Sequence, residues 1–416
     1  MSDKIKIFTI GDHPLSPSGV GTQTRYMIEG LLKTGKYTVV SFGGAIKHDQ
    51  YGAQKTEEYG DDWVIWPVDG YGNPDMIRAM IHQQKPDILW FMTDPRFYGW
   101  LWAIDNEIRQ HIPMVYYHVW DNYPYPRFNR AAYLSNDHVA CISQLTYDIL
   151  QTVAPETNSS YLPHAVDSDV FTPLSTEVIE KFKKERSISG KFVCVWNNRN
   201  ARRKQSGTLI WWFKEFLDRV GHDKATLIMH TDVKDQNGQD LEAIIRELGL
   251  TNGEVLFSTQ KVNAPDLAAM YNMADVTINI SDAEGFGLAT LESLSCGTPI
   301  LVNMTGGLQD QITDGENWFG IGLEPSSKAI IGSQEVPYIY EDRLAREDFL
   351  TALTTLYEMS PEERTKIGAA GRAWALDKFS FDNFINSWDE LLTNIHETDG
   401  SWETRENYQA YEVRTY

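Results

Sequence analysis

The sequence contains little cysteine. Only three cysteines occur among 416 residues, each inside an apolar run and none with C-x-x-C spacing. This scarcity excludes a disulfide framework. We therefore expect Cys141, Cys194 and Cys296 to be buried free thiols in a reducing compartment, which predicts a cytoplasmic protein.

Positive charge is also scarce. The 37 Lys and Arg residues are outnumbered by 58 Asp and Glu residues, so the formal net charge is −21. Such a surface repels nucleic acid phosphates and anionic lipid, so we expect no nucleic acid partner and weak or no membrane association. Any phosphate that binds requires a local cationic pocket, which makes the few clustered Arg and Lys residues informative.

Long apolar runs are absent from the N-terminus. MSDKIKIFTIGDHP contains one short apolar stretch that ends in a polar loop, which predicts a first β-strand rather than a signal peptide or a membrane span. A chain of 416 residues exceeds the size at which one hydrophobic core usually stops growing, so two domains are expected.

The first half alternates short apolar runs with helical patterns, among them helices near 21–32 and 144–153. Near-continuous hydrophobic strands separated by helices indicate a parallel sheet covered on both faces. The expected strands are KIKIFTI (4–10), YTVVSF (37–42), WVIWPV (63–68), DILWFM (87–92), MVYYHV (114–119) and HVACIS (138–143).

A second βα series follows a join near 165–190. Its expected strands are FVCVWNN (192–198), TLIMHT (226–231), EVLFS (254–258), DVTINIS (275–281) and TPILVN (298–303). Two sheets are more economical than one sheet of more than ten strands. We predict an α/β protein with two Rossmann-like, doubly wound domains over 1–168 and 169–378, a helix over 379–396, and a polar, loosely held tail over 397–416.

The most specific motif is DVTINISDAEGFGLATLESLSCGTPILV (275–302). It predicts a buried strand, a glycine loop and a helix that Gly297 ends. The helix N-terminus therefore lies at the carboxyl edge of a parallel sheet, where free N–H groups and the helix dipole attract phosphate. The residues expected to hold a diphosphate there are Gly285, Phe286, Gly287 and Leu288.

Two glutamates flank this loop. A carboxylate only accepts hydrogen bonds, so Glu284 and Glu292 suit sugar hydroxyls better than phosphate. We assign Glu292 to a ribose and Glu284 to a transferred sugar. The alternative is that Glu284 is an ordinary loop carboxylate and Glu292 a solvated helix residue.

The second motif is VWNNRNARRKQ (195–205), the densest cationic cluster of this acidic chain. Arg199, Arg202, Arg203 and Lys204 follow the first strand of the second domain, which delivers them to the same sheet edge as the glutamate loop. These charges could neutralise a diphosphate leaving group. A solvated basic loop is the alternative.

Two motifs of the first domain are weaker. SPSGVGTQTR (16–25) places Gly19 and Gly21 after the first strand, where they could cradle a phosphate or form an ordinary turn. The motif lacks the third glycine and the downstream acid of a Rossmann dehydrogenase.

MVYYHVWDNYPYPRF (114–128) places His118 at a strand end, either to bind a donor hydroxyl or as a structural residue. Trp120, Asp121 and Tyr123 are acceptor-side candidates, although the aromatic residues also suit packing.

With these residues placed, the chain resembles the glycosyl transferases group 1 family of retaining GT-B enzymes, over nearly all of 4–390. The resemblance rests on E-G-F-G-L-x-x-x-E at 284–292, N-R-N-x-x-R-K at 198–204 and LPHAVDSDVF at 162–171. In the last segment Ala165 stands where the family usually has glycine. The basic cluster spaces its Arg and Lys by five positions, where many relatives have six.

The resemblance implies two domains facing each other across a cleft, the first on the acceptor side and the second binding a nucleotide-sugar donor. It implies that Arg199 and Lys204 bind the diphosphate, Glu292 the ribose, and Glu284 and His118 the transferred sugar. The loop at 19–21 would lie over the phosphates. The helix FSFDNFINSWDELLTNI (379–395) would cross back to the first domain.

The activity so implied is sugar transfer to an acceptor hydroxyl with retention of configuration. No D-x-D triplet stands at the end of an expected strand, and protein cations could replace a metal, so we expect neither a metal nor a cofactor. Two alternatives stay open: a sugar-nucleotide hydrolase or epimerase, and a non-catalytic sugar-nucleotide-binding subunit.

Overall fold

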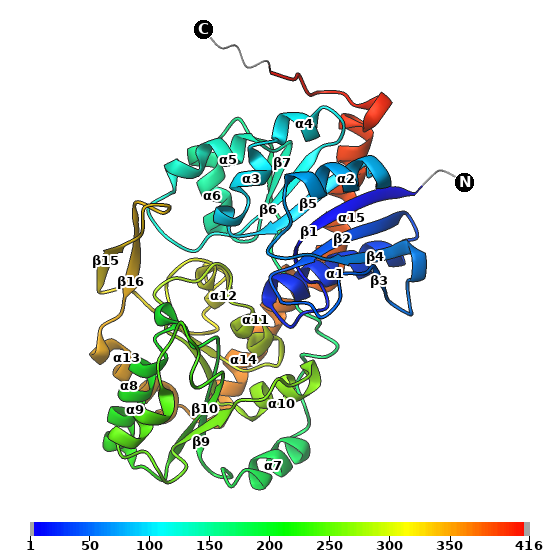
Figure 1. Ribbon diagram of the computed structural model, residues 1–416. Helices are drawn as coiled ribbons and strands as arrows, with labels where there is room; N and C mark the ends of the chain where they lie inside the picture. Colours follow the sequence, from blue (N-terminus) through cyan, green and yellow to red (C-terminus); the bar gives the residue numbers. More distant parts are fainter. Residues whose placement is uncertain (1–3, 412–416) are drawn as a thin grey trace. The chain divides into compact units, whose positions relative to one another are not determined.

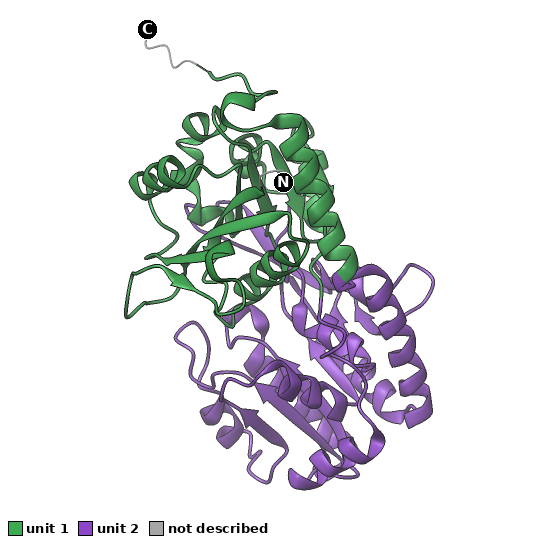
Figure 2. Cartoon of the chain, turned by 90° about the vertical axis from the view of Figure 1, so that its right-hand side faces the viewer, with its two compact units in different colours: residues 1–120, 125–165, 382–416 green, residues 121–124, 166–381 purple. Residues whose placement is uncertain are grey.

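The computed structural model describes residues 4–411. The chain divides into two compact units (Figures 1 and 2): unit 1 takes 1–120, 125–165 and 382–416, and unit 2 takes 121–124 and 166–381. Each unit has its own sheet of mainly parallel strands. The predicted architecture of two doubly wound α/β units is therefore confirmed.

Unit 1 is built on an eight-stranded sheet in the order β3-β4-β2-β1-β5-β6-β7-β8, parallel except for β3 against β4. All residues of β5 and β6 are buried, as expected for strands covered by helices on both faces. The strands are β1 (Ile5–Asp12), β2 (Tyr37–Gly44), β3 (Gln54–Lys55), β4 (Trp63–Pro67), β5 (Ile88–Thr93), β6 (Met114–His118), β7 (His138–Cys141) and β8 (Ser159–Tyr161). The helices are α1 (Gly19–Lys33), α2 (Pro74–Gln84), α3 (Gly99–Trp102), α4 (Asp105–Arg109), α5 (Arg130–Leu134) and α6 (Gln144–Val153).

Helix α15 (Phe381–Asp399) follows unit 2 in the sequence, but from residue 382 onward it belongs to unit 1. Its Trp388 is fully buried, with ring centroids 5.8 Å from Trp90 and 4.9 Å from Tyr117. On the same helix Asp389 accepts hydrogen bonds from Lys36 Nζ and Tyr37 Oη, both at 2.6 Å. Aromatic packing and these charge-assisted bonds hold the helix on the sheet.

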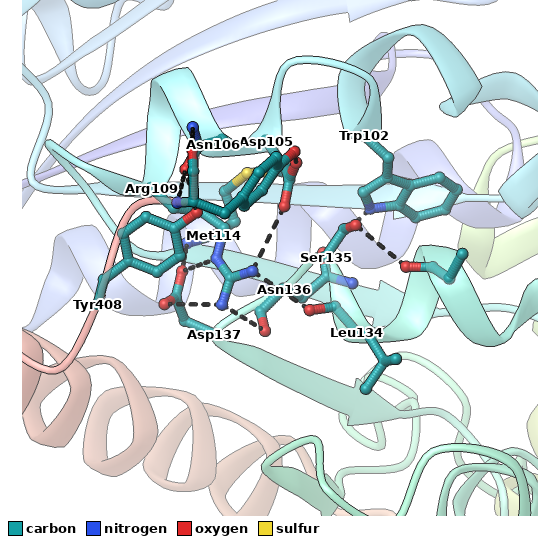
Figure 3. A network of polar contacts seen from close by, with 12 residues as sticks. Trp102, Asp105, Asn106, Arg109, Met114, Leu134, Ser135, Asn136, Asp137 and Tyr408 are labelled. Atoms are coloured by element: carbon teal, nitrogen blue, oxygen red, sulfur yellow. Dashed lines mark hydrogen bonds and ion pairs between the residues drawn. The ribbon is translucent and has the colours of Figure 1, made fainter. Parts of the chain in front are cut away.

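The tail after α15 is bound to unit 1 as far as residue 411, so the expectation of a loosely held tail is wrong there. Arg405 Nη2 donates to Asp137 Oδ1 at 2.7 Å, and both side chains are more than nine-tenths buried. Asp137 also pairs with Arg109 Nε at 3.1 Å, and the Tyr408 ring lies 4.6 Å from the Arg109 guanidinium (Figure 3). Polar composition therefore did not mean weak attachment. Residues 412–416 of the predicted tail lie outside the described part.

Unit 2 has a six-stranded parallel sheet in the order β11-β10-β9-β12-β13-β14. Trp196, Phe213 and Met229 lie in its main hydrophobic core. The strands are β9 (Phe192–Asn197), β10 (Ala225–His230), β11 (Val255–Ser258), β12 (Val276–Asn279), β13 (Ile300–Asn303) and β14 (Gly320–Leu323), with a separate antiparallel pair, β15 (Ser327–Ile331) and β16 (Ile339–Arg343). The helices are α7 (Thr176–Glu185), α8 (Ser206–Val220), α9 (Leu241–Glu247), α10 (Ala264–Met273), α11 (Leu288–Ser295), α12 (Leu308–Ile312), α13 (Arg346–Glu358) and α14 (Pro361–Lys378).

The chain enters unit 2 earlier than residue 168, the predicted end of the first domain. Residues 121–124 already belong to unit 2. A β-bridge joins Tyr123 to Tyr340 of β16, and Asn122 Nδ2 donates to the Tyr340 carbonyl at 3.1 Å. These backbone and amide contacts place the tetrapeptide beside the β15–β16 hairpin, and the chain returns to unit 1 at residue 125. The second domain proper begins at residue 166.

Candidate active site

The candidate site lies at the carboxyl edge of the unit 2 sheet, where β9 and β12 are neighbours. The chain runs outward from β9 through β10 to β11, then returns to β12 and continues to β13 and β14. The strand order therefore reverses between β9 and β12, and such switch points are where open α/β sheets bind ligands. The basic cluster follows β9, and the glutamate loop follows β12.

The structure brings Lys204 and Glu284 into direct contact. Lys204 ends a short 3-10 turn (Arg202–Lys204), and its Nζ donates to Glu284 Oε2. Asn279 Nδ2, from the last residue of β12, donates to the same oxygen at 3.2 Å. Both charged side chains are about nine-tenths buried, and a buried ion pair persists only when its partners are well satisfied.

The electrostatics of this pair are uneven. Burial lowers the pKa of Lys204 to about 8, and the neighbouring Arg203 charge adds to the effect. Burial opposes ionisation of Glu284, but Lys204 and Arg203 outweigh it and hold the pKa of that carboxyl below its usual value. The site thus presents an ionised carboxylate and an ammonium group with two further N–H donors for a ligand.

The three arginines of the cluster take different positions. Arg203 donates to the Ala283 carbonyl at 3.1 Å and pairs with Asp121 at 3.3 Å, and its own carbonyl accepts from the Asp282 amide at 2.8 Å. These contacts fasten the basic loop to the glutamate loop. Asp121, predicted on the acceptor side, therefore contacts the basic cluster within unit 2.

Arg202 and Arg199 point to other partners. Arg202 makes a bidentate pair at 2.6 and 2.8 Å with Glu341 of β16, which is buried. Arg199 pairs with Asp235 at 2.6 Å, and its side chain is 64% exposed. Arg203 rather than Arg199 therefore joins Lys204 at the glutamate loop, which the sequence did not distinguish.

Two glycines shape the loop between β12 and α11. Gly287 precedes α11 with φ +92°, where a Cβ atom would lie 2.6 Å from Leu308 and 2.8 Å from Thr290. Gly306, after β13, has φ +53°, and a Cβ there would overlap the Glu284 carbonyl. The next amide, that of Gly307, donates to the Glu284 carbonyl at 3.1 Å. This second loop was not predicted, although M-T-G-G (304–307) directly after the buried strand β13 was its signal.

Of the other predicted loop residues, Gly285 and Phe286 are buried and Leu288 is half-buried. Gly285 and Leu288 lie on either side of the Phe286–Gly287 turn, and Leu288 is the first residue of α11. Phe286 is buried, with its ring 5.8 Å from Phe379 and its carbonyl accepting from Gln311 at 2.8 Å. Phe286 thus anchors the loop through its ring.

Glu292 lies on the second turn of α11 and is partly buried. Its Oε2 accepts a hydrogen bond from Tyr271 Oη at 2.7 Å. Burial raises its pKa to about 7. These contacts contradict the alternative of a solvated helix residue.

The remaining predicted residues lie in unit 1, with one exception. Gly19 begins α1 directly after the Ser18 cap, and the Gly21 amide donates to Ser18 Oγ at 2.9 Å. His118 is fully buried at the end of β6, 3.0 Å from Tyr133 Oη, and burial lowers its pKa to about 3. Trp120 is buried with its ring 5.9 Å from Phe128.

Tyr123 is the exception, since it belongs to unit 2. Its ring stacks on Tyr340 with the centroids 6.4 Å apart, and its hydroxyl accepts from Gln309 Nε2 at 3.2 Å. Tyr123 therefore has a packing role in the structure. A sugar-binding role for it, and the roles of the unit 1 residues, stay predictions.

Comparison with known proteins gives a family match over part of the chain. Residues 178–374 match the family model of glycosyl transferases group 1, a range that contains the basic cluster and both glutamates. This part of the chain belongs to that family. The group 1 match lies entirely within unit 2, and the resemblance seen in the sequence motifs is confirmed.

Two curated relatives are similar to parts of the chain. It is 35% identical over 187 residues to the D-inositol 3-phosphate glycosyltransferase of Arthrobacter sp. (strain FB24), an alignment that covers 45% of this chain and 42% of the relative. It is 26% identical over 272 residues to the GDP-mannose-dependent alpha-(1-6)-phosphatidylinositol monomannoside mannosyltransferase of Mycolicibacterium smegmatis, covering 63% of each chain. The chain thus spans from under half to under two thirds of these relatives' lengths.

Solved structures extend the likeness to both units. Sucrose-phosphate synthase from Thermosynechococcus elongatus superposes with a TM-score of 0.73 at 16% identity, covering 95% of this chain and all of that one. HepE from Anabaena, in complex with UDP-glucose, superposes with a TM-score of 0.67 at 15% identity, covering 94% of this chain and all of that one. The chain therefore has the GT-B fold.

Two features are absent from residues 4–411. No helix in this range combines the length and the apolar character needed to cross a membrane. Across the same residues, no three His, Cys, Asp or Glu side chains gather in a way that could hold a metal ion.

Proposed function

We propose that this chain is a glycosyltransferase of the cytoplasm that moves a sugar from a nucleoside diphosphate sugar to an acceptor hydroxyl, with retention of configuration and without a metal ion. The observation that carries the proposal is the Lys204–Glu284 pair at the switch point of unit 2. It offers a cation for a diphosphate and a carboxylate for sugar hydroxyls at the N-terminus of α11.

In the proposed reaction, the bond between the anomeric carbon and the diphosphate oxygen breaks, and its electron pair leaves with the diphosphate. The acceptor oxygen attacks the anomeric carbon from the same face, and its proton passes to the departing diphosphate oxygen. Lys204, Arg203 and the N–H groups of α11 stabilise the negative charge that develops on the leaving group. Stabilisation of that charge is the protein's main contribution.

The comparisons support a nucleotide donor without choosing its base. HepE was solved with UDP-glucose, and the mycobacterial relative is described as GDP-mannose-dependent. A hexose donor on UDP or GDP is therefore the first to test for this chain, followed by ADP- and dTDP-sugars.

A thermal-shift screen with these four classes of nucleotide sugar tests the proposal. A ligand at 100 times its Kd stabilises the folded state by about 2.7 kcal/mol, which is easily detected. The donor found in this way should then give a glycoside product when an acceptor panel is added. If no nucleotide sugar shifts the melting temperature, the proposal is wrong.

Metal independence has its own measurement. We expect the transfer rate to be the same with EDTA as with added Mg²⁺ or Mn²⁺, because protein cations take the place of the metal at the diphosphate. Strict dependence on either cation would contradict this expectation.

The alternative activities give different products. A hydrolase or epimerase would convert the donor without an acceptor and without forming a glycoside. A binding subunit would bind the donor but turn over neither donor nor acceptor.

A further inference from the structure

One buried contact of the donor-binding unit has no role in the function proposed so far. Tyr271 lies on the last turns of α10 and is fully buried. Its Oη donates to Glu292 Oε2 at 2.7 Å and accepts a hydrogen bond from Asn197 Nδ2, also at 2.7 Å. Three separate elements thus meet at one hydroxyl: the end of β9, α10 and α11.

The direction of these hydrogen bonds is fixed by chemistry. The Asn197 amide nitrogen can only donate, so the Tyr271 oxygen accepts from it and sends its single proton to the carboxylate. Burial raises the pKa of Tyr271 well above its ordinary value, so the phenol keeps that proton. Glu292 is therefore held by one oxygen in one orientation.

The other carboxylate oxygen is left for a ligand. Within residues 4–411, no hydrogen bond reaches Glu292 Oε1. The Glu292 side chain belongs to α11, the helix that begins at the glycine loop. A carboxylate with one oxygen anchored and the other free suits a pair of vicinal hydroxyls, such as those of a ribose. We propose that Tyr271 is a positioning residue that orients Glu292 toward the ribose of the donor nucleotide, with Asn197 fixing the direction of the tyrosine hydroxyl. This inference rests on the proposed function.

The charged and titratable groups around Glu292 come from three helices. Tyr271 faces it from α10, and the buried thiol of Cys296 lies at the end of α11. Arg372 of α14 acts on that thiol electrostatically, and its Nη1 donates to the carbonyls of Phe171 and Ser295. Tyr271 is thus the group whose hydrogen bond favours the ionised form of Glu292.

Calorimetric titration of the full chain with UDP and GDP tests the inference. For the nucleotide that the wild type binds, Tyr271→Phe should raise Kd about fivefold to twentyfold, below the full loss of a charge-assisted hydrogen bond. KM for the donor should rise similarly while kcat changes little, because ribose contacts are the same before and during transfer. The matched control is Tyr357→Phe, since Tyr357 packs on Phe192 at the opposite end of β9 and should leave Kd unchanged.

A second readout separates positioning from mere packing. Loss of the tyrosine hydrogen bond disfavours the Glu292 carboxylate, so its pKa rises in Tyr271→Phe. Nucleotide binding should then begin to weaken at a higher pH on acidification than in the wild type. Combining Tyr271→Phe with Glu292→Gln should weaken binding no further than Glu292→Gln alone.

The variants also keep the inference falsifiable. If Tyr271→Phe does not fold, Asn197→Ala acts on the same hydroxyl from β9 and should raise Kd in the same direction. If the variants bind as the wild type does with an unchanged pH profile, while Glu292→Gln binds weakly, the positioning role is wrong and the proposed function stands. If the wild type binds neither nucleotide, nor any of the four donor classes, the proposed function fails and the inference fails with it.

Discussion

At the scale of single residues, the two glutamates of the E-x7-E motif have different surroundings. Glu284 is paired with Lys204, and Glu292 with the neutral hydroxyl of Tyr271. The first is ionised well below neutral pH, whereas the second has a pKa of about 7. One motif thus presents two carboxylates that are suited to different parts of one ligand.

This difference predicts different kinetic effects. Glu292→Ala should weaken binding of the free nucleoside diphosphate and raise KM, with kcat little changed, because its contacts are the same before and during transfer. Glu284→Ala should bind the nucleotide almost normally but lower kcat, because positive charge develops at the transferred sugar. Each effect should be about tenfold to a hundredfold, from the size of a charge-assisted hydrogen bond. Calorimetric titration and steady-state kinetics measure these effects. If Glu292→Ala binds the nucleotide as tightly as the wild type does, Glu292 does not bind the ribose.

The lowered pKa of Lys204 predicts an alkaline limb in the pH profile. Its ammonium form is present below about pH 8 and is lost as the pH rises through that value. A neutral amine stabilises a diphosphate poorly, so kcat/KM should fall between pH 8 and 9, since this parameter reports groups of the free enzyme. Lys204→Arg keeps the charge and should abolish the limb even if it lowers the rate. Persistence of the limb in that variant would assign it to another group.

At the scale of elements, the sequence was most informative where long apolar runs alternate with helices. The strands that became β9, β12 and β13 were predicted, as was the glycine turn before α11. The hairpin β15–β16 was missed because both strands are short and β15 is largely exposed, as Ile330 at 72% exposure illustrates. Its Glu341 nevertheless holds Arg202 of the basic cluster.

The candidate site was predicted in composition but not in its contacts. The motifs placed Lys204 and Glu284 at one sheet edge, because adjacent parallel strands deliver their carboxyl ends together. Tyr271 gave no signal, since one tyrosine in an ordinary helix has no pattern and its partner Glu292 lies on another helix. Arg199 and Arg203 were indistinguishable, because loop geometry beyond a strand end has no periodicity.

The loop after β13 allows a prediction at this scale. Gly306→Ala should destabilise the protein by about 2 kcal/mol more than Gly315→Ala, because only the first places a Cβ atom against backbone, that of Glu284. Both positions have positive φ, +53° at Gly306 and +96° at Gly315, so backbone strain is present in the control as well. Denaturant unfolding measures the difference, and donor binding should be lost in Gly306→Ala alone. Equal stabilities would mean that the Glu284 loop moves aside without cost.

At the scale of the whole molecule, the segment after α15 contributes to the stability of unit 1. Arg405→Ala leaves Asp137 buried with one arginine fewer, which should cost about 2–4 kcal/mol. Arg78→Ala removes an exposed pair with Glu107 in the same unit and should cost less than about 1 kcal/mol. Thermal unfolding of both variants tests this, and a similar small effect of both would show that the tail contributes little.

The tetrapeptide 121–124 has a consequence for how such a protein can be recombined. The chain changes unit after residues 120, 124, 165 and 381, so neither unit corresponds to one uninterrupted stretch of gene. A chimera that exchanges only 166–381 would keep the host's Asp121 and Tyr123 against a foreign Arg203 and Tyr340. A single crossover that transfers donor specificity would therefore separate residues that contact each other. A working exchange must transfer residues 121–124 together with 166–381.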